Sequence, residues 1–109
     1  MEKNDERAML RAKINGETAR MPFAELVRFF ASGAMILVSD DLDLVEVAAA
    51  VAEDDAAAVS QWMQAARVAR VTDAQAEAWA AANATLWTVV VKPWILVQRR
   101  GAPPVTSVH

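Results

Sequence analysis

LWTVVVKPWILVQ, residues Leu86 to Gln98, is the most concentrated block of strand-forming side chains in this sequence of 109 residues. Its β-branched and aromatic side chains pack well on a pleated surface, and apolar groups point to both faces. Pro93 cannot donate a hydrogen bond to a sheet ladder, so the run bends, bulges or reaches an edge there. The block predicts interior sheet that the rest of the chain covers, either as one bent strand or as two short strands.

Two helices are predicted on the N-terminal side of this block. The first spans Glu6 to Ile14 and closes before Asn15-Gly16, a pair suited to the left-handed end of a helix. The second begins at Pro22, where a missing amide costs nothing, and it ends at Gly33. Its predicted buried stripe has the spacing i, i+3, i+4, i+7 and consists of Phe23, Leu26, Val27 and Phe30.

Three further helices are rich in alanine, and short strands at Ala34 to Val38 and Val68 to Val71 frame them. The third helix starts at the capping-box pair Asp43 and Glu46, and the fourth follows the acidic junction Asp54-Asp55. The fifth starts at a second capping box, Thr72 with Gln75. The fourth helix is expected over residues 56–66, with an inward stripe of Val59, Trp62, Met63 and Ala66. Alanines let backbones approach closely, so few large groups are expected to form a pocket.

These elements predict an α+β fold with about five helices packed on a small three-stranded sheet. Residues 1–100 are expected to form a single domain, and residues 101–109 a disordered C-terminal tail. The order of helices and strands resembles a winged-helix arrangement with an additional helix before the last strand.

The composition argues against several classes of protein. The chain has no cysteine, no apolar run long enough for a membrane span, and no apolar core of a secretory signal after Met1, so a cytoplasmic protein is expected. Its one histidine is His109, so no serine has a histidine base in the body of the chain. We therefore expect no catalytic residue, no cofactor and no metal ligand, which means a protein that is not an enzyme.

Four separated segments resemble a family of short bacterial proteins catalogued as a domain of unknown function, of the DUF 2288 type. The segments are GETAR from Gly16, FAELVRFFASG from Phe23, LDLVEVAAAVAEDD from Leu42 and LWTVVVKPWILVQ from Leu86. The resemblance covers roughly residues 9 to 99 and implies one small cytosolic domain without a transferable catalytic residue. It also implies a helix-closing glycine at position 66, where this sequence has Ala66.

An acidic cluster suggests two interpretations. Carboxylates are ligands that Mg²⁺ and Ca²⁺ prefer, but negative side chains also stabilise the N-terminal end of a helix. No glycine-centred calcium loop is present, so the capping interpretation is favoured and cation binding stays open. The cluster consists of Asp40, Asp41, Asp43 and Glu46.

The leading functional hypothesis is a non-catalytic protein-interaction module whose partner is another protein or, in a homodimer, a second copy. Aromatic side chains often anchor interfaces, and the candidate interaction surface is Trp87, Trp94 and Gln98. The first alternative is an acidic winged-helix regulator that reads DNA through its fourth helix, using Ser60, Gln61, Gln64 and Arg67. A net charge of −3 argues against nucleic acid. The second alternative is a small-ligand or metal-binding protein.

Overall fold

The computed structural model describes residues 2–99, with side chains from residue 5 onward, and the expected C-terminal tail, 101–109, lies outside these residues. The described chain forms five α-helices, one 3-10 helix and five strands. The helices are α1 (Glu2–Glu17), η1 (Phe23–Glu25), α2 (Val27–Ala31), α3 (Leu44–Ala52), α4 (Ala56–Gln64) and α5 (Asp73–Ala82). The strands are β1 (Ala19–Pro22), β2 (Met35–Val38), β3 (Val68–Arg70), β4 (Thr85–Val91) and β5 (Trp94–Gln98).

The α+β class is confirmed, but the expectation of a three-stranded sheet was wrong. The strands form one mixed sheet in the order β1-β4-β5-β2-β3, in which β5 and β2 run parallel and the other neighbours antiparallel. The LWTVVVKPWILVQ block forms two strands, because the chain reverses at Lys92-Pro93, and both strands lie in the interior of the sheet. The Pro93 turn and Trp94 therefore do not lie on an edge strand. The winged-helix comparison is not confirmed.

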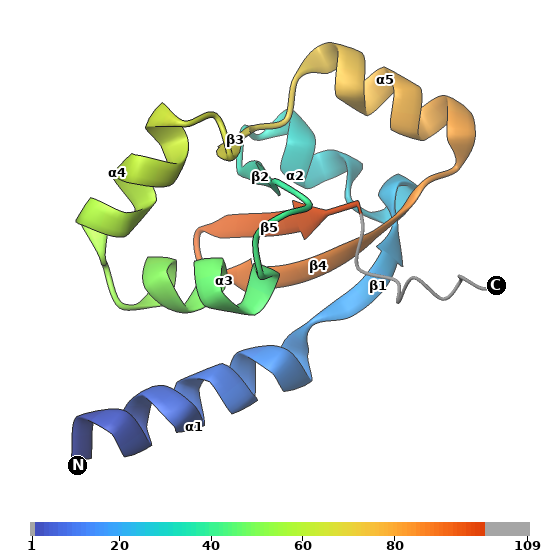
Figure 1. The fold of residues 1–109 in the computed structure, drawn as a ribbon. Coiled ribbons are helices and arrows are strands. Elements are labelled where there is room, and N and C mark those ends of the chain that lie inside the picture. Colours follow the sequence, from blue (N-terminus) through green and yellow to red (C-terminus); the bar gives the residue numbers. More distant parts are fainter. Residues whose placement is uncertain (1, 100–109) are drawn as a thin grey trace, which may run out of the picture.

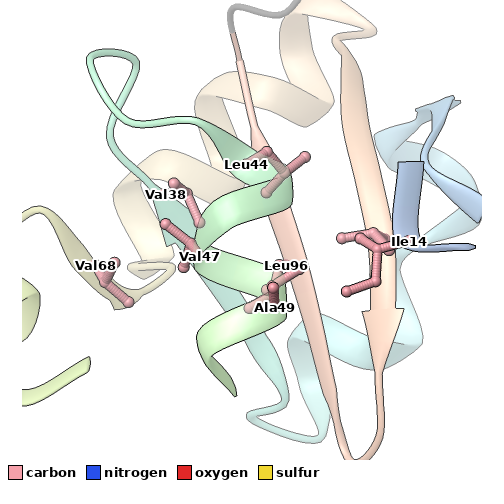
Figure 2. Packing of buried hydrophobic residues seen from close by; sticks show 9 residues of the cluster. Ile14, Val38, Leu44, Val47, Ala49, Val68 and Leu96 are labelled. Atoms are coloured by element: carbon pink, nitrogen blue, oxygen red, sulfur yellow. The ribbon is translucent and has the colours of Figure 1, made fainter. Parts of the chain in front are cut away.

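Helices cover both faces of the sheet (Figure 1). On the first face, α3 and α1 pack on alternate strand residues, including Val38, Val89 and Leu96. Figure 2 shows Val47 and Ala49 of α3 near Leu96, with Ile14 of α1 and Val68 on opposite sides. On the second face, η1, α2 and α5 pack on Met35, Ile95 and Val97. Successive strand residues point to opposite faces, so the run of apolar residues in the central block serves two cores.

The first two predicted helices differ from the observed ones. The first helix, expected to close before Asn15-Gly16, continues as α1 to Glu17, and the Thr18 hydroxyl then bonds the Ile14 carbonyl oxygen at 2.7 Å. The expected helix from Pro22 to Gly33 divides at Leu26 into η1 and α2. A 3-10 helix has 3.0 residues per turn, which turns the following side chains away from the expected stripe. Val27, expected to be buried, is 45% exposed as a result.

The capping signals mostly predict the other helices correctly. Asp43 accepts a hydrogen bond from the Val45 amide at the start of α3, and Thr72 with Gln75 forms a complete capping box at the start of α5. The expected return bond from Glu46 is absent, because the Glu46 carboxylate instead pairs with Arg11 of α1 at 2.8 Å. No helix among residues 2–99 is both long and apolar enough to cross a membrane.

Candidate binding cleft

An apolar cleft of about 330 Å³ opens on the first face of the sheet, between the sheet and helix α4. We call it the α3–α4 cleft. The sheet contributes side chains from β2, β3 and β5, which are Ile36, Val68, Arg70, Trp94 and Leu96. The two helices contribute Ala50 and Val51 from α3 and Ala56, Val59 and Met63 from α4. Asp54 and Asp55, in the turn between the helices, complete the lining together with Ala69.

The cleft lies beside α4, which meets the first core through the partly buried Trp62. No residue of α4 is fully buried, so the predicted inward stripe is confirmed for Trp62 but not along its whole length. Asp54 has a positive φ of 58° at the end of α3, and Asp55 then caps α4 through a bond from the Ala58 amide at 3.2 Å. Ala50 and Ala56 are too short to fill the space that this turn leaves. Met63, expected to be inward, is 58% exposed.

The charged residues of the cleft lining come from two separate segments of the chain. The carboxylates of Asp54 and Asp55 lie in the turn between the helices, and Arg70 is on the edge strand β3. The Arg70 guanidinium carbon is 5.9 Å from the ring centroid of Trp94, a distance at which a cation and an aromatic face attract. Among the side chains that the structure describes, those of residues 5–99, neither Arg70 nor Asp54 takes part in an ion pair. Both charges are therefore available to a partner.

The three residues predicted as an interaction surface do not form one exposed patch. Gln98 is buried, with 6% of its surface exposed, and its amide donates to the carbonyl oxygens of Ser39 at 2.9 Å and Leu42 at 2.7 Å. Trp87 is half-buried against the first core, and its indole nitrogen has no hydrogen-bond partner in the described part of the chain. Only Trp94 lines the cleft, and the buried Leu96 lies between Trp94 and Gln98 along β5.

The predicted DNA-facing residues are exposed, but their surroundings are acidic. Ser60, Gln61 and Gln64 lie on α4, and Arg67 follows it. Arg67 is already paired with Asp41 at 2.7 Å. The N-terminal end of α4, where a phosphate would approach, carries Asp54 and Asp55.

The acidic cluster mainly supports the structure around α3. Asp43 caps α3, and Glu46 pairs with Arg11. Asp41 accepts a hydrogen bond from the Ser39 hydroxyl and forms an ion pair with Arg67. The described residues contain no group of three or more Asp, Glu, His or Cys side chains placed to hold a metal ion.

The cleft was not predicted, because the alanines of these helices favour close packing and leave few large groups to form a pocket. Small side chains permit close approach only where the backbones do approach, and the turn at Asp54 holds α4 away from the sheet. The signal in the sequence was the set of large apolar residues on α4, of which Val59 and Met63 line the cleft while Trp62 packs on the first core.

Two comparisons with known proteins give matches. A solution structure determined by NMR, that of PA1075 from Pseudomonas aeruginosa, is similar at 42% sequence identity and a TM-score of 0.76. The match covers 93% of this chain and 92% of that one. No curated protein is significantly similar. The family model described as "Protein of unknown function (DUF2288)" matches residues 9–99, and the chain therefore belongs to that family.

Proposed function

We propose that this protein is a non-catalytic interaction module and that the α3–α4 cleft binds a segment of a partner protein. The observation that carries this proposal is the composition of the lining, in which ten of the thirteen residues are apolar and three, Asp54, Asp55 and Arg70, are charged. Protein interfaces combine an apolar core with charged groups at the rim, whereas small-molecule sites place polar groups to orient the ligand. The exposed Met63 supports it, because methionine adapts its shape to different partners.

The three charged residues of the lining define the chemistry of the partner. A segment that fits presents one bulky apolar side chain to Val59, Met63 and Trp94. It carries a basic residue on the side of Asp54 and an acidic residue on the side of Arg70. Charge complementarity at the rim of an interface mainly fixes orientation and speeds association, so the apolar anchor supplies most of the affinity.

Selection of a random peptide display library on the folded protein tests this proposal. We expect enriched peptides to share a bulky apolar residue and to shift the amide NMR signals of α4 and of Trp94. Met63→Asp should weaken their binding about tenfold or more, because a carboxylate then enters the apolar centre. Met9→Asp is the matched control, since Met9 is 70% exposed and lies on α1, outside the cleft lining.

Two results would contradict the proposal. One is a selection that enriches no peptide; the other is equal binding of the enriched peptides to wild type and Met63→Asp.

A small apolar ligand is the second candidate, and the cleft volume favours it. The volume of about 330 Å³ is at the lower end of the range of roughly 300–1,000 Å³ for small-molecule sites. Screening of apolar fragments by ligand-detected NMR distinguishes the two. Fragments that bind wild type but not Met63→Asp, in the absence of any peptide binding, would support the small ligand.

A further inference from the structure

A second apolar groove lies on the opposite face of the sheet from the α3–α4 cleft. It is lined by Thr88 and Val90 of β4, Ile95 of β5, and Met21 and Phe29, and its volume is about 560 Å³. Val90 is 50% exposed there, which is unusual for a valine in an interior strand of a covered sheet. The helices of the second face therefore leave part of the sheet without a cover.

A ridge formed by η1 and α2 borders this groove. The division of the helix at Leu26 leaves Glu25, Val27 and Arg28 exposed along the ridge, with Leu26 buried beneath them. Glu25 and Arg28 also line the groove. An exposed valine thus lies between an acid and a base on a ridge next to an apolar hollow.

Glu25 and Arg28 have no ion-pair partner among the side chains of residues 5–99. The two residues are three apart, a spacing at which helical side chains often pair, but they do not pair with each other. The Arg28 guanidinium instead lies over the ring of Phe29, at 5.0 Å from the centroid. The ridge offers one unpaired positive and one unpaired negative group a short distance apart.

We propose that the occupant of this face is a second copy of the chain, in a twofold-symmetric dimer formed ridge against ridge. In a twofold interface each contact occurs twice, so residue i of one copy meets residue j of the other and the reverse. An axis beside Val27 places Glu25 opposite the partner's Arg28, and Arg28 opposite the partner's Glu25. The two valines then meet near the axis, and each copy covers the part of the other copy's groove that Glu25 and Arg28 line.

This inference does not depend on the proposed function, because it uses the other face of the sheet. Along β5, Trp94 and Leu96 line the cleft whereas Ile95 lines the groove. Dimer formation therefore leaves both α3–α4 clefts open, and a dimer would present two of them.

Sedimentation equilibrium of the full chain over a range of concentrations tests the dimer, and a charge exchange tests the contact. Wild type should show a mass that rises from one chain toward two. Glu25→Arg and Arg28→Glu should each raise the dimer dissociation constant about tenfold or more, because each creates two like-charge contacts. An equimolar mixture of the two variants should dimerise as well as wild type, since both contacts then join opposite charges again. The double variant E25R/R28E should also recover.

Controls and contrary results follow from the same measurements. Glu6→Arg and Lys13→Glu change the net charge equally on exposed positions of α1 and should leave the dissociation constant unchanged. A wild-type mass that stays at one chain at every concentration would overturn the dimer. Single variants that dimerise like wild type, or a mixture that does not recover, would overturn this contact even if a dimer exists.

Discussion

Four residues with positive φ close the four helices α2 to α5, and they differ in how well they suit that conformation. Gly33, Asp54, Ala66 and Asn83 have φ values of 81°, 58°, 61° and 52°. Glycine has no Cβ to clash, and the short polar side chains of asparagine and aspartate tolerate this region. Alanine has neither advantage. The structure thus explains why the family resemblance implies a glycine at position 66.

Ala66→Gly should stabilise the protein by about 1 kcal/mol. Glycine removes the cost of a left-handed alanine, roughly 1–2 kcal/mol, but it also raises the conformational entropy of the unfolded chain, which offsets part of that stabilisation. The midpoint of urea unfolding checks this. Ala78→Gly, at an exposed interior position of α5, is the control and should destabilise by about 1 kcal/mol. If both glycines destabilise alike, the strain assigned to Ala66 is absent.

At the scale of elements, short sequence signals correctly predicted those elements that are determined by neighbouring residues. The capping residues at Asp43, Asp55 and Thr72 marked three helices, because a cap acts within a few residues. The valine-rich block predicted interior sheet for the same reason, without deciding between one bent strand and two. Strand β1 was missed, because ARMP from Ala19 has no alternating pattern and is extended through its pairing with β4. The cleft was missed for the same reason, since the position of α4 depends on tertiary contacts.

One side chain joins two elements that are far apart in the sequence. Gln98, at the end of β5, donates both of its bonds to the loop between β2 and α3, at Ser39 and Leu42. Gln98→Leu keeps the volume of the side chain but leaves two carbonyl oxygens without a hydrogen-bond donor. Each unsatisfied oxygen that stays buried lowers the free energy of unfolding by about 1–3 kcal/mol. We expect a loss of about 2–4 kcal/mol in the free energy of unfolding and shifted amide signals over residues 39–43.

Urea unfolding measures the loss, and Gln64→Leu serves as control because Gln64 is exposed on α4 and should change stability by less than about 0.5 kcal/mol. Equal effects of the two leucines would show that the two bonds of Gln98 contribute nothing specific.

At the scale of the whole molecule, stability and binding are separated in space. The centre of the sheet is covered on both faces, and Val38, Leu96 and Val97 are at most 1% exposed. The candidate surfaces lie where cover is incomplete, over β2, β3 and β5 on one face and over β4 and β5 on the other. The parts that bind are therefore expected to be the parts that open most easily, because local opening costs least where few apolar groups are buried.

Native-state hydrogen exchange should show this division as a difference between α4 and the central strands. Amides of β5 and β2 should exchange only through global unfolding, whereas those of α4, in which no residue is buried, should exchange through local opening with a much smaller free energy. A peptide seated in the α3–α4 cleft must raise the protection of α4 and leave β5 unchanged, because binding to the closed form adds to the cost of that opening alone. Protection of free α4 as strong as that of β5 would mean that the helix is fixed by contacts other than the packing described above. The cleft would then be a rigid cavity, and a rigid cavity of this size fits the small-ligand alternative better than an adaptable protein interface.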